Sequence, residues 1–298
     1  MKVQGSDCSI VIKTARTEID VPYSEETLRE AVCLLQEEAA IEGSGICKAI
    51  RKSGGATGCI ITPLTIGTAP VLLYLAMGFA ENPVFVSGAR NLYRYSLNLL
   101  PMEDTERFDL IQDRGGEQRR YEACRIKGFE LRIMRGEAVK LKLDILGERS
   151  PKICQYNRSF VEKSAKNGFA ERFYGDCVTY RINGQEYKNI YGITLVSKKE
   201  GGTKTEVWIK REAVRNTARE NSSDLLNVID ELIISATLLR DRYEQRQFGS
   251  FWLTLKRLVL TSDETSINST DTVIGPLRYY VSDTVTANVY IAGKEWLA

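Results

Sequence analysis

Two segments of the sequence alternate apolar and polar residues with a period of two, and this alternation restricts the fold more than any other feature. In the first segment, Phe129, Leu131 and Ile133 alternate with charged residues. A turn at residues 135–136 follows, and the alternation resumes over residues 139–145. Successive side chains of a strand point to opposite faces, so each segment has one apolar and one polar face. The pattern predicts antiparallel hairpins that bury one face and leave the other in solvent.

A second hairpin is predicted over residues 193–209, with its turn at Gly201-Gly202. Residues 227–243 fit both a strand and one face of a helix, and the β-branched pair at 233–234 favours a strand. The predicted fold class is therefore mainly β. Residues 6–21 are predicted to form a polar strand or an arm. The other segments predicted to form strands span residues 92–99, 107–111, 121–134, 177–211, 251–255 and 285–291.

An amphipathic helix is predicted over residues 24–41. Ser24 occupies an N-cap position and two glutamates follow it in the first turn. Apolar residues then recur every three or four positions from Leu28 to Ala39, which is the spacing of one helix face. We expect this helix to cover one face of a sheet.

A second, short helix is predicted over residues 69–77. Pro70 lies near its first turn, and Gly78 follows an apolar run. Between the two predicted helices, residues 53–58 are rich in glycine but lack the Gly-Lys-Ser/Thr ending of a phosphate-binding loop. We interpret residues 53–58 as a flexible connection.

The length of 298 residues is typical of two domains, although one large β domain is an alternative. A polar stretch over residues 147–168, which contains Pro151, is the predicted boundary. We therefore expect a first domain over residues 1–150, a linker over residues 151–175 and a second domain over residues 176–298.

The sequence contains no histidine. Its absence removes the usual general base, the Ser-His-Asp and Cys-His arrangements, and the commonest metal ligand. Adjacent carboxylates occur at 25–26, 37–38 and 263–264, but neighbouring side chains point in different directions and are typical of solvated surface. We predict that the protein is not an enzyme and has no catalytic, cofactor or metal site.

The seven cysteines are scattered along the chain and form no CxxC pair, which favours a reduced, intracellular protein. The N-terminal segment lacks the pattern of a signal peptide. The longest apolar stretch, residues 70–80, is shorter than the roughly 20 residues that span a bilayer. No membrane anchor is predicted.

The 41 basic and 39 acidic residues leave a net charge of +2, which is too balanced to indicate a nucleic-acid-binding surface. Tyr93 and Tyr95 flank Arg94, an arrangement that can stack bases, but two tyrosines on one strand face are ordinary stabilisers of a sheet. The run Arg119-Arg120-Tyr121 is interpreted as facing solvent or a neighbouring subunit.

The order of these segments resembles that of bacteriophage tail tube proteins, in particular the longer kind with two β-sandwich domains. The resemblance begins with the helix at 68–78, which ends in Leu-Ala-Met-Gly, and the turn Asp-Arg-Gly-Gly at 113–116. It continues through the tyrosine-led strand at 121–131 and the return strand at 136–145. Residues 175–210 are similar to a duplicate of the same sandwich.

The resemblance implies a mainly β fold of two tail-tube-like sandwich or barrel domains, flanked by one or two short helices. It also implies subunits that assemble into rings, which stack into a hollow conduit for DNA. The expected partners are other copies of the chain, other tail proteins, and double-stranded DNA that passes without specific binding. No cofactor is implied. The expected location is the tail of a virion assembled in the host cytoplasm.

In this family a long hairpin or loop reaches the next ring. Residues 100–120 are the first candidate for that contact, and the polar stretch 261–272 is the second. If both halves are tube-like sandwiches, a trimer would imitate a six-fold ring. The candidate ring-contact residues are Asp113, Arg114, Gly115, Gly116, Asp263, Glu264, Asn268 and Asp271.

Two other functions stay open from the sequence. A monomeric β-sandwich module that binds carbohydrate or peptide would use the same strands, although Trp208, Trp252 and Trp296 are too far apart in the chain to indicate a sugar-stacking platform. A hydrolase that uses carboxylates is the third candidate. Oligomeric state separates the first two functions, and a cleft with an acidic pair would support the third.

Overall fold

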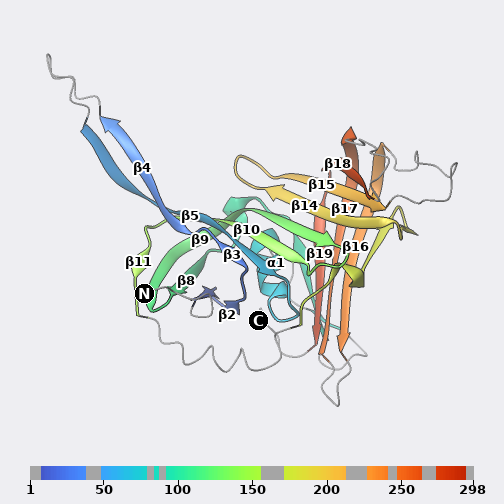
Figure 1. Ribbon diagram of the computed structural model, residues 1–298, viewed down its shortest axis with the longest axis horizontal. Coiled ribbons are helices and arrows are strands. Elements are labelled where there is room, and N and C mark those ends of the chain that lie inside the picture. The colour runs from blue at the N-terminus through green and yellow to red at the C-terminus, as the bar shows by residue number, and fades with distance from the viewer. Residues whose placement is uncertain are drawn as a thin grey trace.

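The computed structural model describes residues 8–37, 48–78, 84–86, 92–155, 171–212, 227–240, 247–263 and 273–292. Over these residues the fold is mainly β, with 19 strands linked in one antiparallel sheet and a single α-helix, α1 (Ala69–Met77). The mainly β fold class predicted from the sequence is confirmed. In the described residues the sheet folds over itself like a sandwich but does not close into a barrel (Figure 1).

The strands fall into two groups in chain order. The first group is β1 (Cys8–Lys13), β2 (Glu18–Val21), β3 (Glu25–Glu26), β4 (Arg29–Glu37), β5 (Lys48–Pro63), β6 (Val84–Phe85), β7 (Leu92–Asn98), β8 (Phe108–Arg114), β9 (Glu117–Met134), β10 (Lys140–Gly147) and β11 (Lys152–Ile153). The second group is β12 (Val178–Ile182), β13 (Gln185–Glu186), β14 (Ile190–Lys198), β15 (Lys204–Glu212), β16 (Val228–Arg240), β17 (Gln247–Asp263), β18 (Val273–Val281) and β19 (Val285–Ala292).

Two long strands hold the sheet together. The first half of β9 pairs with β8 and its second half pairs with β14, while β10 pairs with the middle of the strand. β17 is similar, because it passes from pairing with β19 to pairing with β18 at Arg257, whose φ is +54°. The β9–β14 and β7–β19 pairings both join the first predicted domain to the second.

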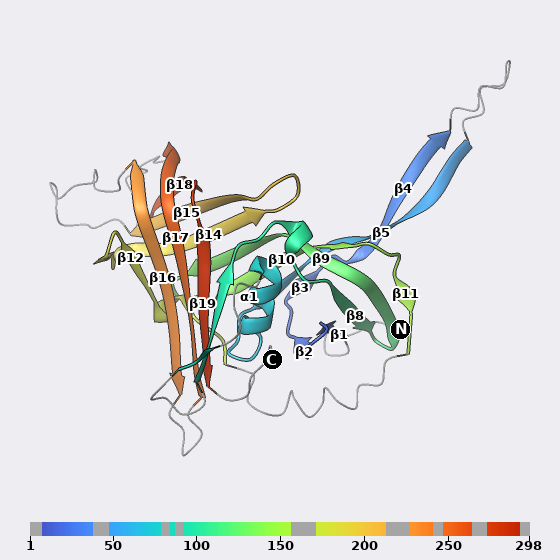
Figure 2. The same ribbon diagram turned by 180° about the vertical axis from the view of Figure 1, so that it is seen from behind.

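The helix α1 lies in the middle of the fold, between these strand groups (Figures 1 and 2). All nine of its residues are buried, which is expected of a helix that is apolar on every side. Before the helix, the hydroxyls of Thr65 and Thr68 hydrogen-bond at 2.9 Å, and after it Gly78 donates its N–H to the carbonyl of Tyr74. The helix predicted over residues 69–77 is confirmed.

The helix predicted over residues 24–41 is wrong: the described part of this segment contains strands β3 and β4. Both strands pair with β5, and the β4 pairing contains an irregularity between Glu30 and Val32. Ser24 does not cap a helix, since its N–H and hydroxyl both donate to the carbonyl of Ile61. Long-range pairing with β5 therefore outweighed a local helical pattern.

The glycine-rich residues 53–58 belong to strand β5 and are not a flexible connection. Gly55 has a φ of +91°, and a Cβ there would lie 2.2 Å from the carbonyl oxygen of Gly147. At Gly58, with a φ of +154°, a Cβ would lie 2.6 Å from the carbonyl oxygen of Thr27. These glycines allow close approach of neighbouring backbones.

The other predicted strands and turns agree with the structure where it describes them, except that the segment at 6–21 contains two paired strands, β1 and β2, and not one. Within the segment at 227–243, residues Val228–Arg240 form strand β16, and residues 241–243 lie outside the described residues. The turns at residues 135–136 and 201–202 connect β9 to β10 and β14 to β15. The polar stretch predicted over residues 261–272 begins inside a strand, because β17 continues to Asp263. Residues 264–272 lie outside the described residues.

A contiguous hydrophobic core runs through both groups of strands. Tyr95, Tyr121 and Tyr279 are among its largest fully buried side chains. Phe173 packs edge-on against Phe251 of β17, with ring centroids 5.1 Å apart. The core therefore lies on both sides of the predicted boundary between domains.

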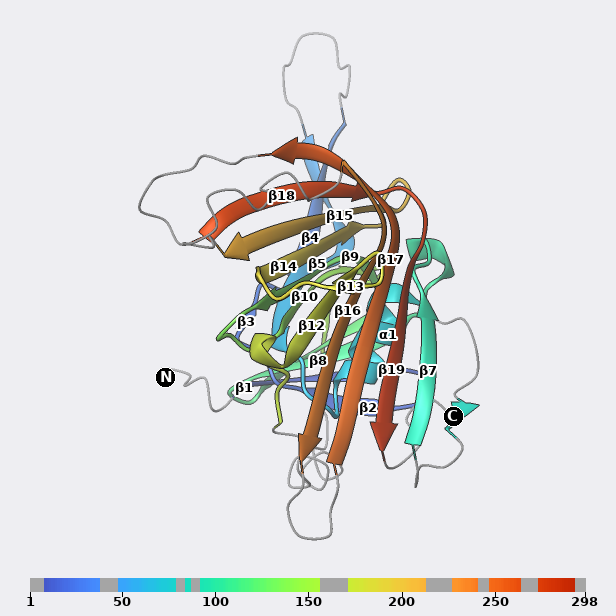
Figure 3. The same ribbon diagram turned by 90° about the vertical axis from the view of Figure 1, so that its right-hand side faces the viewer.

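Strand β4 and the first part of β5 leave the body of the molecule as a two-stranded hairpin, which we call the arm (Figures 1 and 3). Its outer register runs from the pair Val32 and Ser53 to the pair Glu37 and Lys48. The second part of β5 is part of the body, where it pairs with β10. One continuous strand thus connects the arm to the core.

Candidate interaction surfaces

The predicted ring-contact residues at 113–116 form a tight turn between β8 and β9. Asp113 accepts hydrogen bonds from the N–H of Gly116 and from the amide of Gln118, both at 2.9 Å. Arg114 pairs with Glu26 of β3. Gly115 and Gly116 have positive φ values, as such a turn requires. The turn is short, and its charged side chains are bound within the chain.

The second set of predicted ring-contact residues is described only at Asp263, which ends β17 opposite Leu277 of β18. Glu264, Asn268 and Asp271 lie outside the described residues. Figure 1 shows β8 and β17 in different parts of the molecule, so the structure does not bring Asp113 and Asp263 together.

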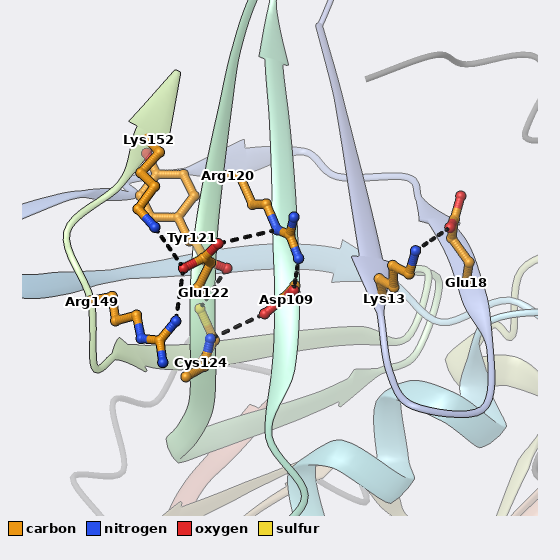
Figure 4. Close-up of polar contacts among 10 residues, drawn as sticks. Lys13, Glu18, Asp109, Arg120, Tyr121, Glu122, Cys124, Arg149 and Lys152 are labelled. Carbon is orange, nitrogen blue, oxygen red and sulfur yellow. Dashed lines mark hydrogen bonds and ion pairs between the residues drawn. The ribbon is translucent and has the colours of Figure 1, made fainter. Parts of the chain in front are cut away.

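A surface depression of about 370 Å³ lies beside β8 and β9, and we call it the charged pocket. Its walls come from four places: the end of β1, the start of β8, the first half of β9, and the residues after β10 (Figure 4). The charged side chains that line it are Lys13, Arg107, Asp109, Arg120, Glu122 and Arg149.

Glu122 is the central carboxylate of the charged pocket (Figure 4). Its Oε2 lies 3.1 Å from both Lys152 Nζ and Arg149 Nη1, and its Oε1 lies 3.8 Å from Arg120 Nε. Hydrogen bonds from Lys152 and then Arg149 lower the pKa of Glu122 below its ordinary value, because they favour the ionised carboxylate. Glu122 therefore stays charged and holds three cations around it.

Asp109 is the second carboxylate, and a backbone irregularity positions it. Its Oδ1 accepts the N–H of Ala123 at 3.1 Å, where Ala123 has a φ of +52° and interrupts the β8–β9 register. Its Oδ2 lies 2.5 Å from Arg120 Nη2. A non-glycine residue with positive φ is strained, and the Asp109 hydrogen bond offsets part of that cost.

In the ion pairs of Glu18, Asp109 and Glu122, the cations are more exposed than the carboxylates. Arg107 pairs with Glu148 at 2.8 Å and Lys13 with Glu18 at 3.9 Å. The side chains of Lys13, Arg107, Arg149 and Lys152 are between 54% and 67% exposed. Those of Glu18, Asp109 and Glu122 are between 16% and 26% exposed, and that of Glu148 is 46% exposed. The surface around the pocket therefore presents positive charge to solvent.

Apolar side chains also gather on the outer face of the second group of strands. Val228, Val259 and Tyr280 are exposed and lie opposite one another across β16, β17 and β18. Trp208 of β15 is exposed nearby, and the guanidinium of Arg278 lies 5.5 Å from its ring centre. A row of exposed apolar residues on one face is typical of a surface that contacts a partner.

Sequence reasoning placed Arg119 and Arg120 at the surface, and both are partly exposed. It did not connect Arg120 with Lys13 or Arg149, because these residues are far apart in the chain. The same prediction is wrong for Tyr121, which is buried and whose hydroxyl donates to the side-chain oxygen of Gln112 at 2.9 Å.

Within the described residues, no helix has the length and apolar character needed to cross a bilayer. In the same residues, no three side chains of the His, Cys, Asp or Glu types gather as metal ligands would. No family model matches the chain, and no curated protein is significantly similar to it.

Proposed function

We propose that this protein is a structural subunit of a phage or phage-like tail tube. In this proposal, copies of the chain assemble into rings, and the rings stack into a hollow conduit through which double-stranded DNA passes without specific binding. Its other partners are tail proteins, and it belongs to the virion after assembly in the host cytoplasm.

The arm is the observation that carries this proposal. An isolated two-stranded hairpin is marginally stable in water, and the arm extends beyond the core that would support it (Figure 3). Contact with a second copy supplies the missing support. The arm also replaces the turn at 113–116 as the candidate for contact between rings, because that turn is short and its charges are bound within the chain.

Open sheet edges favour assembly as well. Among the described strands, β2, β4 and β13 each pair along one side only. A free edge invites another strand, and closed assembly of several copies removes it. A mainly β fold with a short helix agrees with part of what the resemblance to tail tube proteins implies, although that resemblance implies a helix that flanks two domains and α1 is buried inside one sheet.

The test is negative-stain electron microscopy of the purified protein across a range of concentrations, with light scattering alongside. We expect rings or tubes with a central hole, and the images give the number of subunits per ring. A stable monomer at every concentration would overturn the proposal. It would favour the alternative, a monomeric ligand-binding module, for which the charged pocket is the candidate site.

Removal of the arm tests whether the arm is needed for stacking of rings and not for folding of the body. The register partners Val32 and Ser53 can be joined through an Asn-Gly turn, which suits a two-residue hairpin connection. We expect a thermal unfolding midpoint close to that of the unaltered protein and single rings that do not stack, measured by circular dichroism and electron microscopy. The matched control is Gly201→Asn, which places an Asn-Gly turn between β14 and β15 and should leave stacking intact.

A further inference from the structure

We propose that the outer face of strands β16, β17 and β19 binds neutral carbohydrate, and that a sugar ring stacks on Trp252. The inference goes beyond assembly and does not depend on it, because it requires only the folded chain. The face points away from α1, which packs on the opposite side of β19 and β7 (Figure 3).

Trp252 lies in the middle of this face. It is 46% exposed, and Ser235 of β16 and Asn288 of β19 lie opposite it on either side. Its indole N–H donates to the hydroxyl of Ser250 at 3.0 Å, and that hydroxyl donates to the carbonyl of Ala236 at 2.9 Å. The chain thus satisfies and orients the one polar group of the indole, so the side chain offers solvent an apolar ring.

Tyr290 of β19 supplies a second aromatic ring. Its centroid lies 5.7 Å from that of Trp252, and the two ring planes are tilted by 56°. The residues are diagonal neighbours, since Tyr290 lies opposite Ser250 and Trp252 lies opposite Asn288. The sequence did not indicate this platform, because the ring that joins Trp252 is a tyrosine from another strand. Together the two rings make an aromatic surface wider than either alone.

The side chains around the two rings are uncharged. Three successive outward positions on each of the three strands form this neutral block: Thr237, Ser235 and Ile233 of β16, Ser250, Trp252 and Thr254 of β17, and Tyr290, Asn288 and Thr286 of β19. Charged residues make up 27% of the chain, yet they enter this face only at its margins, as Arg181 of β12 and Arg94 of β7 do. The neutral block therefore suits an uncharged ligand better than a polyanion such as DNA, whose binding depends on contacts between basic side chains and phosphates.

A neutral sugar has the complementary chemistry. A pyranose ring presents C–H groups on its faces and hydroxyl groups around its rim. The C–H groups pack against the negative face of an aromatic ring and leave water, while the rim hydroxyls need hydrogen-bond partners.

The neutral block supplies these hydrogen-bond partners beside Trp252. The hydroxyl-bearing residues Thr254 and Thr286 lie opposite each other in the strand register. The side-chain oxygen of Asn288 accepts the hydroxyl of Ser96 at 3.0 Å, and its amide nitrogen has two further N–H groups to donate. A purely apolar partner would bury these polar groups without replacing their bonds to water, which is costly.

Trp208 of β15 is also exposed, at 38%, but its surroundings are charged. The guanidinium of Arg278 lies 5.5 Å from its ring centre, and Arg278 pairs with Glu206 at 2.7 Å. A guanidinium over the ring blocks stacking on that side. Trp208 is therefore the matched control for Trp252.

Titration with short neutral oligosaccharides tests the site. The probes are β-1,4-linked oligomers of glucose and of N-acetylglucosamine, and binding is measured by isothermal titration calorimetry and tryptophan fluorescence. We expect at least one probe to bind with a Kd of about 1 mM or lower, and Trp252→Ala to weaken that binding by about tenfold or more. Trp252→Phe, which keeps a ring, should retain part of the affinity, and Trp208→Ala should retain all of it. Failure of both probes to bind, or an equal loss in the two alanine variants, would overturn the inference.

The hydroxyl groups beside the ring are tested separately. Thr254→Val with Thr286→Val keeps the shape of the face and removes two hydroxyls. We expect this chain to bind the same oligosaccharide several-fold more weakly, with a thermal unfolding midpoint close to that of the unaltered protein. An unchanged affinity would contradict the assignment of these residues to the sugar rim.

Other occupants of the face give different results. If neither sugar binds and Trp252→Ala raises the concentration at which copies assemble, the face is an interface between copies and the inference is wrong. It is equally wrong if a short DNA duplex binds in place of the sugars and Trp252→Ala abolishes that binding. Sugar binding by a protein that stays monomeric would support the inference and overturn only the assembly function.

Discussion

At the scale of single residues, two glycines determine how closely the second group of strands approaches the end of β9. A Cβ at Gly175 would lie 2.0 Å from the carbonyl oxygen of Met134, and a Cβ at Gly192 would lie 2.3 Å from the sulfur of Met134. Neither glycine could be distinguished in the sequence from those in turns, because the constraint comes from a neighbour about 40 or more residues away in the chain.

We predict that Gly175→Ala lowers the free energy of unfolding by about 2–3 kcal/mol, because the backbone of Met134 must move. Chemical denaturation measures this loss. The control is Gly184→Ala, where φ is +83° but a Cβ meets nothing within 4 Å. That change should cost about 1 kcal/mol from backbone strain alone. Equal losses at the two positions would contradict the close approach at Gly175.

At the scale of elements, the sequence correctly predicted the strands with one solvent-exposed face and the buried helix. It wrongly predicted a helix where β4 lies. Alternation identifies β10 because Leu141 and Leu143 face a core while Lys140 and Lys142 do not. Residues 28–39 have apolar residues at spacings that suit a helix, whereas β5, which pairs with residues 29–37, begins only at Lys48. A local pattern cannot reveal a partner of that kind.

The packing of the β14–β15 hairpin against α1 includes a buried lysine. Lys199 is fully buried. Its backbone N–H donates to the backbone carbonyl of Lys127 at 2.8 Å, and its ammonium donates to the backbone carbonyl of Met77 at 3.4 Å. Burial lowers the pKa of Lys199 to about 8, because it disfavours the charged form. The folded protein therefore binds this proton less tightly than the unfolded chain does.

We predict that Lys199→Met stabilises the protein at neutral pH by up to about 3 kcal/mol, the cost of holding a charged amine in the core. The folded-state pKa is lower than the unfolded one, so the cost is full below pH 8 and disappears as pH rises toward 10.5. The gain from Lys199→Met should therefore shrink over that range. Urea denaturation of both proteins at pH 7.5 and 9.5 measures it, and a gain independent of pH would contradict the assignment.

At the scale of the whole molecule, the sheet and the core both cross the predicted boundary at residues 151–175. Side chains reinforce this connection: Arg135 pairs with Glu212 at 2.7 Å, and Asp176 accepts the N–H of Gly136 at 3.0 Å. The charged pocket is likewise a product of the whole fold, since its residues come from positions 13 to 149 and no motif in the sequence links them.

We predict that a chain cut between its two halves still behaves as one unit. A protease site introduced within residues 156–170, followed by cleavage, should leave both fragments in a single peak on size-exclusion chromatography. The cut protein should also unfold in one transition, because β9–β14 and β7–β19 pairing holds the fragments together. Two separable fragments with separate melting points would show instead that residues 1–150 and 176–298 fold independently.

The continuity of β5 has a mechanical consequence. Its first part belongs to the arm, and its second part pairs with β10 from Ala56 to Pro63. Antiparallel hydrogen bonds lie perpendicular to the strands, so a pull along β5 loads all of these bonds together in shear and does not peel them apart singly. A subunit held by its arm is thus anchored through bonds loaded in shear, and tension on the arm passes through β10 to β9 and the rest of the sheet.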